Sequence, residues 1–404
     1  MDIWITGIGS ICSAGAGSNV LYEASLKSSI NIRTIKVRSG KVKSDIPVCS
    51  VADNALDIAK LKGASKLDRT SQLAFVAANE AWIQSGLNQS NHDPSRVSVI
   101  AGTSRGPVGK WQETYERQIS GKSQLPSLAA TGTMASLSGS LSQCLGVTGT
   151  SLTLSSTCSS GASAVGMGAT LIKGGISDVS VVGGSESVIN EAIISVMKSA
   201  GLLGQDPEYE KTCKPFDVGR NGLVVGEGAG FLIIESSDHV GKRNGTPIAR
   251  LSGWSGGLSL SGKVGVEESG KGLAKTINET IAMAEINPAE INYINAHGTG
   301  TLLNDLCESK AINEVSDLSK VPLSSIKPIT GHCLGASPAL EAVLSIMTLK
   351  EGQMPHTTNL RRIDPQINLN LLKDVPQRMD KSNVLSTSLG FWGNHASLLF
   401  SSIS

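Results

Sequence analysis

The chain has few aromatic and few charged residues for its length. Phe, Trp and Tyr make up 3% of the 404 residues, and Asp, Glu, Lys and Arg make up 17%. The formal net charge is +1, so no excess of one sign favours binding to nucleic acid or to an anionic membrane. The 45 glycines instead indicate close packing of helices against strands, and the length allows two domains or one duplicated unit.

Signals for targeting, membrane insertion and metal clusters are also missing. The N-terminus has no basic segment and begins as a strand, and no apolar run is long enough to span a bilayer. The seven cysteines are an odd number without a CxxC pair, which predicts reduced thiols rather than a disulfide framework or a metal site. We therefore expect a cytoplasmic protein that binds no metal, no membrane and no nucleic acid.

Predicted strands and helices alternate along the chain, which is typical of an α/β fold with buried sheets. A polar, irregular segment at residues 30–65 is expected at the periphery. Helices are predicted at residues 66–85 and 270–284. Apolar strand patterns occur at residues 2–8, 96–102, 178–186, 223–235, 247–253, 291–297 and 385–400.

Cys158 lies between a β-rich segment and a helix of small and apolar residues that ends at Gly174 and Gly175. The free N–H groups at the start of this helix would favour the thiolate form of the side chain. A free cysteine is also commonly a buried packing residue. The local pattern leaves a nucleophile and a structural cysteine as equal alternatives.

A second stretch repeats this pattern around His332. Gly-Ala-Ser at 161–163 follows Cys158, Gly-Ala-Ser at 335–337 follows His332, and each copy continues as an apolar helix. An internal repeat predicts two related halves. We expect such halves to bring Cys158 and His332 together from equivalent helix starts.

His297 follows a predicted strand in Asn295-Ala-His297-Gly-Thr-Gly-Thr301, where α/β folds place functional groups. A zinc site with Cys158 and His332 is disfavoured by the glycine turns and by the lack of a fourth ligand motif. A Cys–His hydrolase needs only one imidazole as its base. Two neutral imidazoles beside a thiol instead suit hydrogen bonding to an enolate or thioester oxygen.

Seven motifs in order from the first strand to the last resemble those of the β-ketoacyl-[acyl-carrier-protein] synthases, the condensing enzymes of the elongating ketosynthase type. They are Lys66-Leu-Asp-Arg69, Thr157-Cys158-Ser-Ser-Gly-Ala, Pro215-Phe-Asp217, Gly226-Glu-Gly-Ala-Gly230, Asn295-Ala-His297-Gly-Thr-Gly-Thr301, Lys327-Pro-Ile-Thr-Gly-His332 and Gly390-Phe391. The resemblance implies the thiolase fold, with duplicated α/β halves in an αβαβα layered arrangement. We expect a half at 1–245 carrying the nucleophilic cysteine and a half at 246–404 carrying both catalytic histidines.

The resemblance also implies roles for the central residues. Cys158 would receive the acyl chain as a thioester from the phosphopantetheine of an acyl carrier protein. His297 and His332 would stabilise the enolate formed when malonyl-carrier protein loses carbon dioxide. The backbone N–H groups of Cys158 and Phe391 would form the oxyanion hole, and Phe391 would also gate the acyl pocket. No cofactor is expected, because the substrates arrive on the carrier protein.

Further residues are expected to support this site. Lys327 would order it together with Asp305 and Glu308, although a purely structural charged network fits the sequence equally well. Thr299 and Thr301 are predicted as supporting residues beside His297.

The carrier protein is the expected partner, and the chain itself would form a homodimer or a heterodimer with a chain-length-factor-like subunit. A basic run is predicted to dock the acidic carrier protein, with a solvated helix face as an equal alternative. It consists of Lys60, Lys62, Lys66 and Arg69.

Two segments depart from the family pattern where the substrate would pass. Trp392 stands where the family commonly has glycine after the gate, and residues 256–263 lack the usual His/Pro pattern. These changes favour a specialised acyl chain, such as a polyene or another type II polyketide chain, over ordinary fatty-acid elongation.

Four other functions can be compared with this one. An inactive chain-length factor is rejected because Cys158, His297 and His332 are all present, and a thiolase is disfavoured because no cysteine follows residue 333. The active half of a ketosynthase/chain-length-factor heterodimer and a malonyl-carrier-protein decarboxylase remain alternatives.

Overall fold

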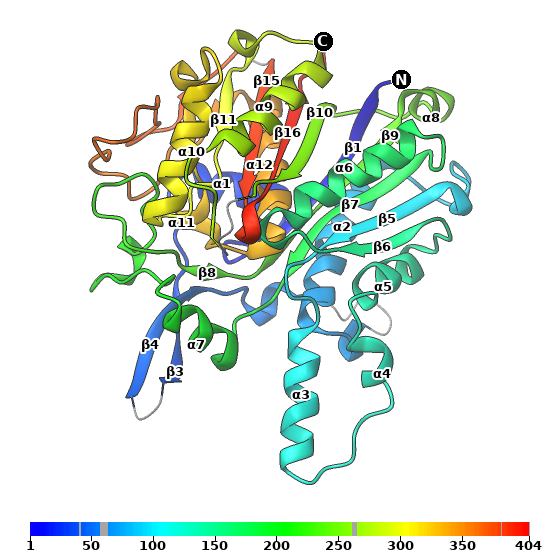
Figure 1. The fold of residues 1–404 in the computed structure, drawn as a ribbon. Coiled ribbons are helices and arrows are strands. Elements are labelled where there is room, and N and C mark those ends of the chain that lie inside the picture. Colours follow the sequence, from blue (N-terminus) through cyan, green and yellow to red (C-terminus); the bar gives the residue numbers. More distant parts are fainter. Residues whose placement is uncertain (40–41, 57–63, 261–264, 381, 404) are drawn as a thin grey trace.

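The computed structural model describes residues 1–404 except 40–41, 57–63, 261–264, 381 and 404. The first half of the chain forms one end of a mixed sheet (Figure 1). Its strands lie in the order β6-β5-β7-β9-β1, with β5 parallel to β6 and β7, and β9 antiparallel to β7 and β1. The strands are β1 (Ile3–Cys12), β5 (Val97–Gly102), β6 (Ser151–Leu154), β7 (Val179–Glu186) and β9 (Gly228–Ser236). All residues of β5, β7 and β9 are buried, which explains their continuous apolar character.

The second half repeats this arrangement in the order β12-β11-β15-β16-β10. Here β11 is parallel to β12 and β15, and β16 is antiparallel to β15 and β10. The strands are β10 (Ala249–Leu258), β11 (Tyr293–Asn295), β12 (Leu323–Ser324), β15 (Asn383–Leu389) and β16 (Asn394–Ser401). Both halves thus have the same strand order and directions, which confirms the predicted duplication.

The two halves join where β1 pairs with β10, with Ile3 opposite Leu251. The predicted boundary between residues 245 and 246 falls in the connection from α8 (Ser237–Lys242) to β10. Strand β11 is shorter than the predicted strand at 291–297, because the chain turns at Gly298 and Gly300, which have φ angles of 34° and 78°.

The two halves of this mixed sheet, joined by the pairing of β1 with β10, act as a first and a second sheet, and helices form three layers around them. Helices α2 (Arg69–Ser85) and α5 (Ser136–Leu145) pack on the outer face of the first sheet, and α9 (Lys271–Ala284) packs on the second, with α10 (Leu302–Glu314) against α9. Helices α6 (Ser160–Lys173) and α12 (Ser337–Glu351) lie between the sheets and contact strands of both halves. This is the αβαβα arrangement that the sequence predicts.

The residues of the internal repeat pack closely at the centre of the molecule. A Cβ atom on Gly184 at the end of β7 would lie 2.7 Å from the carbonyl oxygen of Gly335 and 3.1 Å from the Cα atom of Gly161. No side chain fits at this contact. The small residues therefore let the starts of α6 and α12, which carry Cys158 and His332, approach each other.

Smaller elements surround this core. The hairpin of β3 (Arg33–Ser39) and β4 (Val42–Cys49) pairs with β8 (Val225–Gly226) and lies at the periphery, as predicted. Helix α7 (Glu191–Ser199) packs beside β3, and α3 (Val108–Ile119) with α4 (Leu128–Thr131) projects from the body (Figure 1). The remaining short elements are β2 (Gly15–Ala16), α1 (Ser18–Leu26), α11 (Lys327–Thr330), β13 (Gln353–Met354) and β14 (Gln377–Arg378). Within the described ranges, no helix has the length and apolar character needed to cross a membrane.

Candidate active site

The thiol of Cys158 and the imidazole of His332 meet between the two halves. Cys158 lies in the 3-10 turn Thr157–Ser159 that leads into α6. Its Sγ atom is 3.2 Å from Nε2 of His332, whose Nδ1 atom is 3.1 Å from Oγ of Ser337. The backbone of His332 is held by Val224, whose carbonyl accepts its N–H at 2.7 Å. The pairing that the sequence repeat predicts is therefore present.

Burial determines the charge state of this pair. It raises the pKa of Cys158 to about 12, and the nearby ammonium of Lys327 opposes only part of this effect. Burial also lowers the pKa of His332 well below its usual value, and Lys327 lowers it further. The predicted thiolate bias is thus wrong for this structure, because desolvation outweighs the helix start. A neutral imidazole instead lies ready to accept the proton of a neutral thiol.

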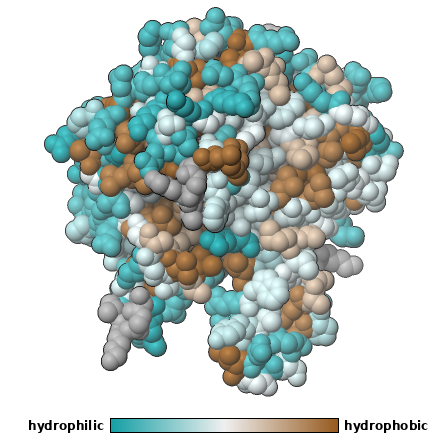
Figure 2. Space-filling model, viewed as in Figure 1, coloured by the Kyte–Doolittle hydropathy of each residue, from teal (hydrophilic) through white to brown (hydrophobic). Residues whose placement is uncertain are grey.

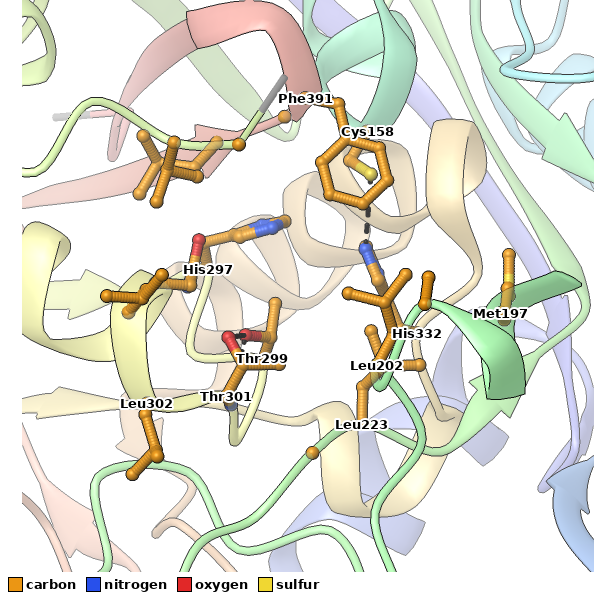
Figure 3. Close-up of a pocket in the computed structure, with 18 of the residues that line it drawn as sticks. Cys158, Met197, Leu202, Leu223, His297, Thr299, Thr301, Leu302, His332 and Phe391 are labelled. Carbon is orange, nitrogen blue, oxygen red and sulfur yellow. Dashed lines mark hydrogen bonds between the residues drawn. The ribbon is translucent and has the colours of Figure 1, made fainter. Parts of the chain in front are cut away.

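His297 lies beside His332, with the ring centroids 5.2 Å apart and the ring planes at 84° (Figure 3). Its backbone position is fixed by Glu308, which accepts the N–H of His297 at 2.7 Å and that of Gly298 at 2.8 Å. Thr387 donates a third hydrogen bond to Glu308, while burial raises the pKa of this carboxyl to about 7. Burial lowers the pKa of His297 well below its usual value, so both rings are neutral.

Lys327 pairs with Glu341 rather than with the carboxylates that the sequence suggested. Its Nζ atom is 2.5 Å from Oε1 of Glu341, contacts the carbonyl oxygen of His297, and lies 3.3 Å from Nδ1 of that ring. Glu341 was missed in the sequence, although it is the only charged residue between positions 337 and 349 of an apolar helix. A buried acid in such a segment is rarely unpaired, and this signal points to a basic partner.

Asp305 holds the turn after His297 and does not contact Lys327. Its Oδ1 atom accepts the N–H of Thr299 at 3.0 Å and that of Gly300 at 3.2 Å, and Oδ2 accepts the N–H of Phe216 at 2.8 Å. The hydroxyls of Thr299 and Thr301 are 3.0 Å apart. Asp305 and Glu308 therefore position the loop that carries His297, which corrects the expected grouping with Lys327.

A cavity of about 390 Å³ opens onto these residues (Figure 3). Cys158, His297, His332, Thr299 and Thr301 line its polar part. The apolar wall includes side chains that sequence reasoning did not identify, because no motif marks them. They are Met197, Leu202, Leu223, Leu334 and Leu389.

Phe391 lies next to Cys158 at this cavity (Figure 3). The preceding Gly390 packs so tightly that an added Cβ atom would be 3.0 Å from the backbone nitrogen of Cys158. Trp392 follows with a left-handed φ of 62°, and its side chain is 60% exposed and does not line the cavity. Trp392 therefore affects the backbone conformation of this loop and does not contact the acyl pocket directly.

The predicted docking residues have different surroundings. Lys60 and Lys62 lie outside the described residues, and Lys66 is exposed. Arg69 instead forms ion pairs with Glu227 at 2.8 Å and with Asp53 at 2.9 Å, and it also bonds to the carbonyl of Val51. Arg69 thus joins α2 to the strand β9 region, and its role in docking stays a prediction.

Comparison with known proteins gives a consistent result. The family models for the N-terminal and C-terminal domains of β-ketoacyl synthases match residues 2–239 and 255–361. Nodulation protein E of Rhizobium leguminosarum bv. trifolii is 31% identical, with 98% of each chain covered. The 3-oxoacyl-[acyl-carrier-protein] synthase 2 of Staphylococcus aureus (strain N315) is 29% identical, covering 98% of this chain and 97% of that protein.

The fold also matches solved structures. The ishigamide ketosynthase/chain length factor superposes with a TM-score of 0.91 at 26% identity, covering 100% of this chain and 99% of the other. The two family models together span most of the sequence, and the duplicated fold agrees with them. The chain therefore belongs to the β-ketoacyl synthase family.

Proposed function

We propose that this chain catalyses the decarboxylative condensation of malonyl-carrier protein with an acyl chain held as a thioester on Cys158. The contact of 3.2 Å between Sγ of Cys158 and Nε2 of His332 carries this proposal. This contact supports His332 as the base for the Cys158 thiol, at the wall of an apolar cavity and beside a second neutral imidazole.

In the first half-reaction, His332 accepts the thiol proton at Nε2 while Sγ attacks the carbonyl carbon of the acyl thioester. The new carbon–sulfur bond forms as the bond to the phosphopantetheine sulfur breaks, and His332 returns the proton to that leaving thiolate. The developing oxyanion is assigned to the backbone N–H groups of Cys158 and Phe391.

In the second half-reaction, malonyl-carrier protein loses carbon dioxide and forms an enolate. Lys327 donates towards Nδ1 of His297, so the proton of this neutral ring resides on Nε2, where it can stabilise the enolate oxygen. The enolate carbon then attacks the acyl carbonyl on Cys158, and the thiolate leaves as the 3-oxoacyl product forms on the carrier protein. Lys327 is in this account a positioning residue.

The two half-reactions can be separated with Cys158→Ala. This variant should form no acyl-enzyme but still release carbon dioxide from malonyl-carrier protein, because His297 and His332 remain. His297→Ala should reduce decarboxylation more than acyl loading, since His297 has no contact with Sγ. A Cys158→Ala variant that still elongates acyl chains would refute the proposal. Carbon dioxide release without condensation by the unmodified protein would favour the decarboxylase alternative.

We propose a polyene or other type II polyketide chain as the acyl substrate. The apolar wall of the cavity and the departure from the family pattern at residues 256–263 support this choice. Saturated and polyenoyl thioesters of matched length should show faster loading of the polyenoyl series. A preference for the saturated series would instead place the enzyme in fatty-acid elongation.

We propose that the chain works as a dimer, either with itself or with a chain-length-factor-like subunit. Helix α3 has no buried residue and exposes an apolar stripe at four-residue spacing, formed by Trp111, Tyr115 and Ile119. One solved relative is described as a ketosynthase/chain length factor. Native mass spectrometry should show a dimer that Trp111→Glu weakens, and an unchanged dimer would exclude α3 from the interface.

We propose that the enzyme acts in the cytoplasm without a resident metal or cofactor. All seven cysteines are free thiols, which suits a reducing compartment. The chemistry above needs only the thioester, the malonyl carboxylate and side chains of this chain. Condensation should therefore continue after dialysis against a chelator, and loss of activity that added metal restores would contradict this.

A further inference from the structure

We propose that Asn394 is a positioning residue that holds the backbone N–H of Phe391 in the oxyanion hole, an inference that rests on the condensing function proposed above. Phe391 and Cys158 both line the cavity (Figure 3). Among the described residues, the backbone N–H groups of these two residues have no hydrogen-bond acceptor. Both groups are thus free to donate to the oxygen of an acyl thioester, provided that the turn carrying Phe391 keeps its conformation.

The turn that joins β15 to β16 has an unfavourable residue at its centre. Trp392 and Gly393 have φ angles of 62° and 74°, and the backbone N–H of Asn394 closes the turn on the carbonyl oxygen of Phe391. Positive φ at both central residues is typical of type I′ turns, which prefer Asn-Gly or Gly-Gly at these positions. A bulky side chain is strained there, so Trp392 favours a different backbone conformation.

The surroundings of Trp392 do not offset this strain. Its side chain is 60% exposed, and Leu258, which pairs with Asn394 at the end of β10, is exposed as well. Figure 2 shows hydrophobic and hydrophilic surface side by side near the middle of this face, where β10 and β16 end in Figure 1. The indole thus lies at the surface rather than in the core, and its packing does not hold the turn.

Asn394 holds the turn on both sides of the Phe391 N–H. Its Nδ2 atom donates to the carbonyl oxygen of Phe391 at 2.9 Å, and its own carbonyl oxygen accepts the N–H of Gly390 at 2.7 Å. The N–H of Phe391 lies between these two held groups along the backbone, so both contacts fix its direction. Thr157, in the turn that carries the nucleophile, adds a longer hydrogen bond of 3.4 Å to the same carbonyl oxygen. These contacts stabilise the turn against the strain of Trp392.

The test uses two reactions of Cys158 that differ in their need for an oxyanion hole. Acyl transfer from an acyl-pantetheine thioester develops negative charge on the carbonyl oxygen, whereas alkylation by iodoacetamide displaces iodide from a carbon atom and develops none there. In Asn394→Ala, the maximal rate of acyl loading should fall about tenfold with little change in the half-saturating thioester concentration. The rate of alkylation at Cys158 should not fall. Asn370→Ala is the matched control, because Nδ2 of Asn370 donates to the carbonyl oxygen of Lys320 at 2.8 Å away from the cavity.

A double variant tests the role of strain. Adding Trp392→Gly to Asn394→Ala should raise the loading rate several-fold, because glycine adopts a positive φ without strain. A double variant that loads no faster than Asn394→Ala would overturn the opposition between these two residues.

The remaining outcomes decide the positioning role. An unchanged loading rate in Asn394→Ala would overturn it. A parallel fall of loading and alkylation, or an equal fall of loading in Asn370→Ala, would also overturn it, because either result indicates general damage to the fold. An unmodified protein that is alkylated at Cys158 but loads no acyl group would instead refute the condensing function itself.

Discussion

The ammonium of Lys327 lies 2.5 Å from Oε1 of Glu341, and both side chains are shielded from solvent. The second carboxylate oxygen of Glu341 has no hydrogen-bond partner among the described residues. Burial raises the pKa of Glu341, and Lys327 opposes this rise. Because Lys327 also contacts His297, the pair connects the central helix α12 to one of the two imidazoles.

Removal of the carboxylate should therefore cost stability as well as activity. Glu341→Gln leaves the buried ammonium without its counter-ion, and we expect the free energy of unfolding to fall by about 3–5 kcal/mol. The double variant Lys327→Met, Glu341→Leu should recover much of this loss but not decarboxylation, because the orientation of the His297 proton is lost. Urea unfolding and carbon dioxide release measure the two effects. A Glu341→Gln variant as stable as the unmodified protein would contradict this role of the pair.

The raised pKa of Cys158 predicts how the thiol reacts with pH. With a pKa of about 12, the thiolate fraction should increase about tenfold per pH unit between about pH 7 and pH 10. The rate of iodoacetamide alkylation at Cys158, followed by peptide mass spectrometry to separate it from the exposed Cys144, should rise throughout this range. A plateau near about pH 8 would show that the start of α6 lowers the pKa after all.

The close contact of Gly184 with the repeat glycines predicts a strong effect of one added methyl group. Gly184→Ala should lower the free energy of unfolding by about 1–3 kcal/mol and slow acyl loading, because it separates the starts of α6 and α12. Gly139→Ala is the control, since an added Cβ in α5 meets no atom within 4 Å and should stabilise the helix slightly. Thermal unfolding and loading rates compare the two. Equal behaviour of both variants would refute the packing argument.

The ion pairs of Arg69 predict that its substitution lowers stability without changing docking of the carrier protein. Arg69→Met leaves Glu227 buried without its cation and should destabilise the protein by about 2–3 kcal/mol. The preference for carrier-bound over carrier-free thioester should stay as in the unmodified protein at temperatures where the variant is folded. A selective loss of carrier-dependent loading would instead show that Arg69 is a docking residue.

The sequence predicts the parts of this site that lie in motifs. The shared Gly-Ala-Ser after Cys158 and His332 indicates the duplication, because only small residues fit where the two central helices begin. No motif predicts Glu341 as the partner of Lys327. The pairing depends on how helix α12 packs in the folded protein, which the sequence pattern does not show. The pKa of Cys158 depends on its burial between both halves of the fold. This burial cannot be predicted from the residues at the start of α6 alone.

The central claim is that Cys158 carries the acyl chain. It is tested most directly by the mass of the intact protein after incubation with acyl-carrier protein and removal of the carrier. The account predicts one added acyl group, which fragmentation places on Cys158 and which is absent in Cys158→Ala. An acyl adduct of equal yield in Cys158→Ala, or no adduct in the unmodified protein, would contradict it.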